Sequence, residues 1–261
     1  MFGDRNHLVR SGTLCSNNGR IMMAGAIVWE GDSLLTGDPI VVIATWDSKN
    51  PKTGDMVQMY IMVANVEPHI AVKSGEDAAV CGNCPQRLSV GGSCYVKTFQ
   101  APLSIYRAYK RGSYNRIISY DKLQGKPIRF GSYGDPAAVP YEVWADVIDN
   151  IKPSMTTGYT HQMNDRSFDR RMAGINMISV ETPKMAQKAH GLGFRTFRVT
   201  SDTDQVLPNE IICPNDTSGV QCVDCGLCDG AGDKPSIVIQ VHGALANRYV
   251  SKYDKINVVN L

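Results

Sequence analysis

Apolar segments alternate with amphipathic segments from residue 127 onward, and this alternation constrains the fold more than any other feature of the chain. Strands that alternate with helices through short connections form a parallel sheet with crossover helices. The pattern fits an open doubly wound sheet or part of a barrel. We prefer an α/β, TIM-barrel-like parallel β/α barrel, small or irregular, because no Gly-x-Gly-x-x-Gly turn and no Walker-type phosphate loop is present. The predicted strands are 127–133, 156–160, 176–180, 196–200 and 236–241, and the predicted helices are 140–150, 165–172 and 183–190.

The segment before these repeats is expected to contain a β-hairpin. Residues 39–45 form a continuous, largely β-branched run, which is typical of a strand buried on both faces. A turn at 50–55 separates this run from a second predicted strand at 56–66. The length of 261 residues fits a single domain. Within it we distinguish an N-terminal extension (1–36, in which the apolar residues 21–29 can form a strand), the hairpin with the first cysteine group (37–100), and the β/α repeats with the second cysteine group (127–245).

Seven of the eight cysteines fall into two groups, and the eighth, Cys15, is either a further ligand or a bystander. Cysteines two residues apart can bring both sulfurs to one ion, because the turn between them points both side chains inward. Thiolates at this spacing are typical ligands of zinc or of an iron–sulfur cluster, and disulfides are the alternative. The first group is Cys81, Cys84 and Cys94; the second is Cys213, Cys222, Cys225 and Cys228, followed by His242.

The N-terminal residues 1–7 are polar and lack the apolar stretch of a signal peptide. No run reaches the roughly 18 apolar residues of a membrane span. We therefore expect a cytoplasmic protein without a membrane partner. A reducing compartment favours thiolate–metal bonds over disulfides.

Polar residues follow the predicted strands at the end where parallel α/β folds place their catalytic groups. Asp135 follows the first of these strands, His161 the second, Glu181 the third and Asp202 the fourth. Each one alone is typical of a turn, a helix cap or a structural hydrogen bond. Together, at successive strand ends, they indicate an enzyme cleft with carboxylates and a histidine available for acid–base or nucleophilic chemistry.

A stretch around a predicted helix at 102–110 interleaves tyrosines with basic residues. Cations neutralise phosphates and tyrosines stack on unpaired bases, so the pattern fits a nucleic-acid contact. A solvated amphipathic helix with its tyrosines packed inward fits equally well. The net charge of +2 requires any such contact to be a local patch. The candidate residues are Tyr106, Arg107, Lys110, Arg111 and Arg116.

Several segments together resemble a family of phage-encoded, Cys-rich proteins. The likeness runs from about residue 35 to about 245 and includes the segments 54–58, 81–85, 94–96, 131–140, 158–162, 179–183 and 213–228. The layout is similar to that of DpdA-type phage DNA transglycosylases, which are relatives of the tRNA-guanine transglycosylases. That resemblance implies a barrel enzyme in a phage-infected host cytoplasm that exchanges guanine in DNA for a 7-deazaguanine base such as preQ0.

The resemblance also implies roles for individual residues. Asp135 would be the nucleophile at the sugar, His161 would shuttle a proton, and Glu181 or Asp202 would bind the base edge. A structural Zn²⁺ would be held by three cysteines and a histidine, for which Cys222, Cys225, Cys228 and His242 are available. The spacing departs from the Cys-x-Cys-x2-Cys pattern of the tRNA enzymes by one residue, and the first cysteine group has no role in this scheme.

Two further interpretations use the first cysteine group. In a radical S-adenosylmethionine-like enzyme, Cys81, Cys84 and Cys94 would hold a [4Fe–4S] cluster with one open iron. The spacing Cys-x2-Cys-x9-Cys departs from the Cys-x3-Cys-x2-Cys triad of that class. In a non-catalytic nucleic-acid-binding protein, both groups would hold metals that staple long loops together.

Overall fold

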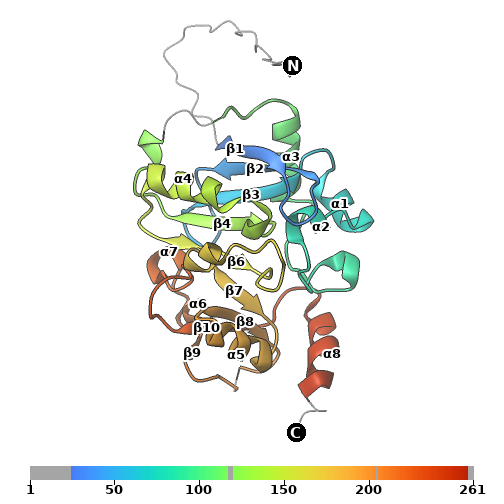
Figure 1. Cartoon of the computed structure of the whole chain (residues 1–261), viewed down its shortest axis with the longest axis vertical. Coiled ribbons are helices and arrows are strands. Elements are labelled where there is room, and N and C mark those ends of the chain that lie inside the picture. The colour runs from blue at the N-terminus through green and yellow to red at the C-terminus, as the bar shows by residue number, and fades with distance from the viewer. Residues whose placement is uncertain (1–24, 117–119, 204, 258–261) are drawn as a thin grey trace, which may run out of the picture.

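The computed structural model describes residues 25–116, 120–203 and 205–257, and they form two five-stranded sheets that lie one above the other in Figure 1. Each strand order reads from one edge of its sheet to the other. The first sheet has the order β1 (Gly25–Asp32), β2 (Pro39–Thr45), β3 (Val57–Val63), β4 (Ile128–Tyr133) and β5 (Thr156–Thr157). The second has the order β6 (Tyr159–Thr160), β7 (Met177–Val180), β8 (Thr196–Thr200), β10 (Ser236–Gln240) and β9 (Glu210–Ile212).

Strand direction divides the first sheet. β1, β2 and β3 pair antiparallel, which confirms the predicted hairpin of 39–45 and 56–66. β3 then pairs parallel with β4, and β4 with β5. All four pairings of the second sheet are parallel. The chain is therefore an α/β protein in which parallel pairing begins at β3.

The closed barrel that we predicted from the sequence was wrong. β1 ends one sheet and β9 ends the other, and the order of the strands leaves both as edges. The antiparallel hairpin adds β2 and β1 beyond β3, where a barrel would need a parallel neighbour. The parallel strands therefore form an open series.

Gly158 joins the two sheets, since it lies between β5 and β6. Its amide donates to the carbonyl oxygen of Cys228 at 3.3 Å, and its carbonyl oxygen accepts from the amide of Met177 at 2.9 Å. A Cβ atom at this position would lie 1.9 Å from Oδ1 of Asn176. A larger residue would have to displace the Asn176 side chain, which favours glycine where one predicted strand, 156–160, is divided between two sheets.

The helices flank the sheets (Figure 1). Those predicted at 102–110, 140–150 and 183–190 are confirmed as α3, α4 and α5. The remaining ones were not predicted, and neither was β9. The α-helices are α1 (Pro68–Ser74), α2 (Ala78–Cys81), α3 (Ala101–Lys110), α4 (Tyr141–Ile151), α5 (Pro183–Gly191), α6 (Pro214–Ser218), α7 (Cys222–Cys225) and α8 (Ala246–Asn257), and the 3-10 turns are η1 (Leu88–Val90), η2 (Asp121–Leu123), η3 (Pro136–Ala138) and η4 (Arg170–Gly174).

The helix predicted at 165–172 is instead a series of turns that leads into η4. Asp165 accepts a hydrogen bond from the amide of Ser167, and Asp169 accepts one from the amide of Arg171. Aspartate side chains that bind nearby amides in this way compete with helical hydrogen bonds. Residues 25–32, within the predicted extension 1–36, form β1, which overlaps the strand considered for 21–29. Residues 1–24, with Cys15, lie outside the described part.

The main core lies around the first sheet. Phe130 of β4 packs against Trp144 of α4 with ring centroids 5.1 Å apart, and both side chains are fully buried. Trp144 Nε1 donates to the carbonyl oxygen of Pro136, so its polar atom is satisfied. α4 is thereby fixed on one side of β4. None of the helices in the described residues has the length and apolar character that crossing a bilayer needs.

Candidate functional site

A cavity of about 280 Å³ lies between the parallel strands and two loops. Its wall is built by side chains of β4, β5, β6, β7, β8 and β10, by the loop that carries the first cysteine group, and by the residues that follow β10. Its size is close to the lower limit for small-molecule sites, about 300 Å³. We call it the central cavity.

Cys81, Cys84 and Cys94 all line the central cavity. Although nine residues separate the last two in sequence, the amide of Cys94 donates to the carbonyl oxygen of Gln86 at 2.8 Å, which returns the chain to the neighbourhood of Cys84. The amide of Cys84 donates to the carbonyl oxygen of Cys81 at 3.0 Å. The loop thus brings Cys94 onto the same wall as the closely spaced Cys81 and Cys84.

A buried ion pair supports this loop from behind. Arg87 Nη2 lies 2.6 Å from Oδ1 of Asp77, and the same guanidinium donates to the carbonyl oxygens of Gly75 and Gly82. Burial raises the pKa of Cys81 well above its ordinary value, and the nearby Cys84 and Cys94 sulfurs raise it further. The Cys81 thiol therefore stays protonated until a cation stabilises its thiolate.

Three of the four predicted strand-end residues form one network beside these cysteines. Asp135 Oδ1 accepts from the amide of Ala137, while Oδ2 accepts from the amide of His161 at 2.9 Å and from Nε2 of Gln162 at 3.1 Å. His161 Nε2 lies 2.8 Å from Oε1 of Glu181. Asp135 and His161 line the central cavity, whereas Glu181 is buried behind His161.

His161 lies between a carboxylate and a sulfur. Burial acts to lower its pKa, but the adjacent Cys84 sulfur and the Glu181 carboxylate outweigh burial and hold the pKa well above its ordinary value of 6.5. Oε1 of Glu181 also accepts from Gln86, while Oε2 is buried without a hydrogen-bond partner among the described residues. The network is anchored to the cysteine loop, because Gln162 also donates to the carbonyl oxygen of Cys81.

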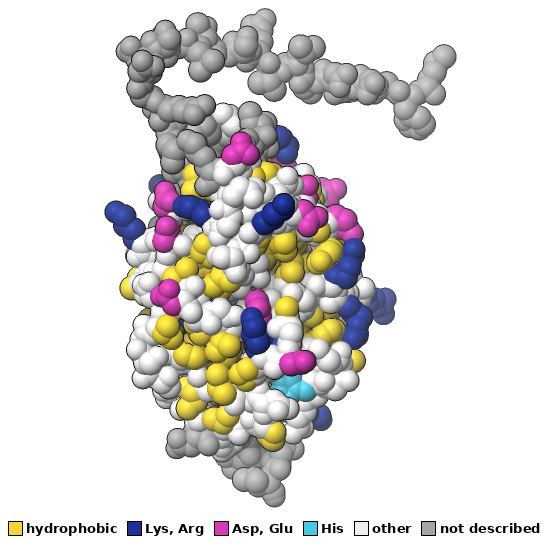
Figure 2. Space-filling view, turned by 90° about the vertical axis from the view of Figure 1, so that its left-hand side faces the viewer, with side chains coloured by type: hydrophobic (Ala, Val, Ile, Leu, Met, Phe, Trp, Pro, Cys, Tyr) yellow, Lys and Arg dark blue, Asp and Glu magenta, His cyan; other side chains and the backbone are white. Residues whose placement is uncertain are grey.

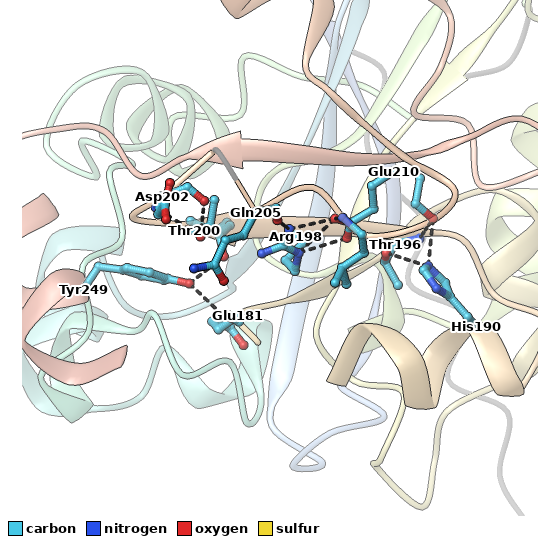
Figure 3. Close-up of polar contacts among 12 residues, drawn as sticks. Glu181, His190, Thr196, Arg198, Thr200, Asp202, Gln205, Glu210 and Tyr249 are labelled. Atoms are coloured by element: carbon cyan, nitrogen blue, oxygen red, sulfur yellow. Dashed lines mark hydrogen bonds and ion pairs between the residues drawn. The ribbon is translucent and has the colours of Figure 1, made fainter. Parts of the chain in front are cut away.

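Asp202, the fourth strand-end residue, lies outside the wall of the central cavity. Its amide and carbonyl group bond with the Thr200 hydroxyl at the end of β8. Figure 3 shows these bonds to Thr200, together with Tyr249, whose hydroxyl donates to the carbonyl oxygens of Glu181 and Val199. Asp202 is thus not brought together with Asp135 and His161.

The second cysteine group lines a separate cavity of about 30 Å³. All four of its cysteines contribute to that wall, and Cys222 also lines the central cavity. Burial raises the pKa of Cys228 to about 12. The four residues are Cys213, Cys222, Cys225 and Cys228.

His242 is not part of this group. Its ring packs 5.1 Å from the ring of Tyr95, its Nδ1 lies 3.2 Å from the carbonyl oxygen of Gln240, and it lines the central cavity. The ligand set that the resemblance implied is therefore not brought together. The fourth residue beside Cys222, Cys225 and Cys228 is Cys213 and not His242. In the described part of the chain, no three His, Cys, Asp or Glu side chains already converge as the ligands of one ion do. All seven described cysteines are free thiols, so the disulfide alternative is not realised.

The second group also connects distant parts of the chain. The amides of Cys222 and Val223 donate to the carbonyl oxygens of Lys52 and Thr53, and Lys52 pairs with Asp216 at 3.1 Å. The segment that carries α6 and α7 thus extends from the edge of the second sheet to the β2–β3 turn. On the face that carries α7, positive and negative side chains are interspersed (Figure 2).

The predicted nucleic-acid patch lies on and after α3, away from the central cavity. Tyr106 is buried and Tyr109 donates to Glu30. Arg107 pairs with Glu67, Arg116 pairs with Glu30, and Lys110 donates to the carbonyl oxygen of Ala64, while Arg111 is exposed. The tyrosines thus serve packing, and most of the basic side chains already have protein partners.

Residues that sequence reasoning missed complete the central cavity, above all Arg129, Tyr159 and Thr157. The signal in the sequence was an arginine between Ile128 and Phe130, two apolar strand residues. Comparison of the chain with family models, with curated proteins and with solved structures gave no match. The proposals that follow therefore depend on this geometry.

Proposed function

We propose that this chain is an iron–sulfur enzyme of the radical S-adenosylmethionine kind, with Cys81, Cys84 and Cys94 as the ligands of a [4Fe–4S] cluster. The observation that carries this proposal is the position of three free thiols from one loop on the wall of a single cavity. A cluster with four irons and three cysteine ligands keeps one iron for a ligand in the cavity. Such a cluster supplies one-electron chemistry.

The chemistry of the donor set fits this group. The three sulfurs are half-buried and line one cavity, and soft thiolates are the ligands that iron–sulfur clusters use. The fold of the loop offsets the unusual spacing, because the hydrogen bond from Cys94 to Gln86 returns the third cysteine towards the second. The thiols need to rotate inward on binding, since they do not yet converge on one point.

His161 supports the same site. A histidine with a raised pKa carries positive charge, and it lies against Cys84. A cation at this place stabilises thiolate sulfur and the negative charge of a thiolate-bound cluster. Glu181, which bonds Nε2 of the ring, fixes its orientation.

Anaerobic reconstitution tests this proposal. The full chain is incubated with iron, sulfide and a thiol reductant, and iron, sulfide and visible absorption are measured per chain. We expect a lower content of iron and sulfide per chain, by one cluster, in each of the variants Cys81→Ala, Cys84→Ala and Cys94→Ala. Each variant should also lose the reductant-dependent consumption of S-adenosylmethionine. Cys225→Ala, in the other group, is the matched control and keeps that consumption. A wild-type protein that takes up no iron, or consumes no S-adenosylmethionine, contradicts the proposal.

DNA-guanine exchange is the second candidate, and one observation favours it. Asp135 and His161 both line the central cavity, and Glu181 bonds to His161, so a carboxylate and an acid–base pair lie together. Both oxygens of Asp135 already accept hydrogen bonds, three in all, which lowers its nucleophilicity. The base would also have to leave the DNA stack to enter the cavity.

Incorporation of a labelled preQ0-type base into DNA tests the second candidate. We expect labelled DNA with the wild-type chain loaded with Zn²⁺, and none with Asp135→Asn, which keeps the shape of the side chain. Asp202→Asn is the matched control, because Asp202 lies outside the cavity wall. Equal labelling by wild type and Asp135→Asn would exclude a nucleophilic role for Asp135.

A further inference from the structure

Arg129 places a guanidinium at the central cavity, and no carboxylate among the described residues pairs with it. One of its nitrogens, Nη2, lies 3.5 Å from the hydroxyl of Tyr95, and its Nε is buried without a hydrogen-bond partner among the described residues. The groups that act on its charge are Tyr95, Tyr159 and Cys222, none of which is a carboxylate. The guanidinium is half-buried, and a charge that is partly removed from water is costly unless it is paired. Its nitrogens are therefore available to pair with an anionic group of a ligand in the cavity.

Other groups on the same wall show what kind of molecule would bring that anion. The hydroxyls of Tyr133 and Thr157 are buried and have no hydrogen-bond partner among the described residues. Tyr159 and Phe197 lie on the wall with ring centroids 4.3 Å apart, and the Tyr95–His242 pair lies on it as well. Unpaired polar atoms among aromatic rings are the usual design of a site for a largely apolar ligand with a few polar groups.

Arg129 and the first cysteine group lie at opposite ends of β4. Arg129 is the second residue of the strand and Tyr133 is the last. Their partners on β3, Gln58 and Tyr60, are two residues apart, so β4 bulges between Arg129 and Tyr133 and the two lie about 7 Å apart along the sheet. Just beyond Tyr133, the amide of Asp135 donates to the carbonyl oxygen of Val80, the residue before Cys81. A ligand bound to Arg129 therefore points its other end towards the cysteines.

We propose that the central cavity binds an aromatic substrate with a carboxylate or phosphate group, and that Arg129 holds this anionic group. The guanidinium fork matches both anions by paired hydrogen bonds. The role of this molecule as a substrate rests on the proposed function, whereas its binding does not. The same arrangement orients the substrate, because the anion is fixed at one end of the cavity and the reacting part faces Cys81, Cys84 and Cys94.

Cys222 is the competing partner for Arg129. It lines the central cavity and is among the groups that act on the charge of Arg129. If the second cysteine group holds a metal as thiolates, Arg129 would balance their charge instead of holding a substrate. The experiment therefore has to measure ligand binding and metal content on the same variants.

Matched pairs of probes test the proposal on the full chain. The anions are indole-3-acetate and phenyl phosphate, and their uncharged partners are indole-3-acetamide and phenol. Dissociation constants come from NMR titration of wild type, Arg129→Gln and Arg129→Lys, with circular dichroism as the check on folding. We expect at least one anion to bind wild type roughly tenfold more tightly than its uncharged partner. Arg129→Gln removes that preference, and Arg129→Lys keeps part of it.

Three results would overturn the assignment. In the first, the anions bind wild type no better than their uncharged partners, or not at all. In the second, the preference for the anion survives in Arg129→Gln. In the third, Arg129→Gln loses metal from the second cysteine group while anion binding is unchanged. The probes bind independently of iron, so their titration also succeeds or fails on protein that holds no cluster. A failed reconstitution at Cys81, Cys84 and Cys94 would contradict the proposed function and leave the Arg129 result intact.

Discussion

The Nε2 atom of His161 lies 2.8 Å from Oε1 of Glu181, and the Glu181 side chain is almost fully buried. The pair connects the end of β6 with the end of β7 and lies against the loop of the first cysteine group. Because the pKa of His161 in the fold is raised above its ordinary value of 6.5, the interaction stabilises the fold fully below that value. The stabilisation is lost as the pH rises through the folded-state pKa.

Glu181→Gln tests this relationship in metal-free protein. The substitution removes one of the two groups that raise the His161 pKa, so we expect that pKa to fall and the alkaline loss of stability to begin at lower pH. NMR titration of the His161 ring and urea unfolding across a pH series measure the two effects. Glu142→Gln is the control, because Glu142 lies in an exposed pair with Arg171. Wild-type His161 that titrates at or below 6.5 would show that the pair does not form.

The second prediction concerns which side chains would hold a metal ion at the second cysteine group. Cys213 lines the small cavity together with Cys222, Cys225 and Cys228, whereas His242 packs against Tyr95. We therefore expect Cys213→Ser to lower the metal bound by this group and His242→Ala to leave it unchanged. Metal analysis after chelation and reloading with Zn²⁺ measures both variants against a Cys81→Ala background, which weakens the other site. If His242→Ala loses zinc and Cys213→Ser retains it, the prediction is wrong and the ligands are those implied by the resemblance, with His242 as the fourth.

The strand pattern could be predicted from the sequence because it depends on local hydrophobicity. Residues 39–45 and 196–200, for example, form strands as their composition indicates. Whether the sheet closes into a barrel could not be predicted, because closure depends on whether β1 and β2 pair parallel or antiparallel. The composition of a strand is the same in both cases. The helix expected at 165–172 does not form, because Asp165 and Asp169 accept hydrogen bonds from nearby backbone amides. The apolar pattern of the sequence does not show whether an aspartate will bind an amide in this way or leave it to a helix.

The candidate site was predictable in parts. Asp135, His161 and Glu181 meet because they follow neighbouring parallel strands, and the sequence shows that order. Asp202 follows the next strand, yet its backbone bonds to Thr200 and it lies outside the cavity wall (Figure 3). The grouping of Cys213 rather than His242 with the other cysteines depends on β9, a strand of three residues that no periodicity reveals.

The third prediction concerns Arg198 and Glu210, which form a buried ion pair in the second sheet (Figure 3). Their side chains are 2% and 0% exposed, and the guanidinium donates to both carboxylate oxygens. Removing one partner leaves an unpaired buried charge, so we expect Glu210→Ala to lower the free energy of unfolding by about 3–5 kcal/mol. Urea unfolding measures the change. Arg171→Ala, which breaks the exposed pairs of Arg171 with Glu142 and Asp169, is the control and should change the free energy far less.

The last prediction concerns Gly158, where the chain passes from one sheet to the other. An added Cβ would lie 1.9 Å from Oδ1 of Asn176 and 3.1 Å from Cβ of Phe130, so the methyl group has no room. We expect Gly158→Ala to lower the free energy of unfolding by about 1–3 kcal/mol, as overpacking does. Gly174→Ala is the matched control, since nothing lies within 4 Å of its added Cβ.

A double-mutant cycle identifies the atom responsible for this cost. Asn176→Ala removes the oxygen nearest to the added methyl group, so Gly158→Ala should cost less in that background than in the wild type. An equal cost in both backgrounds would place the strain in the backbone at the sheet junction instead. In that case Gly158 would be needed for its conformation, and the hydrogen bond from its amide to Cys228 would be the contact at risk. Metal binding by the second cysteine group, measured on the same variants, would then fall together with stability.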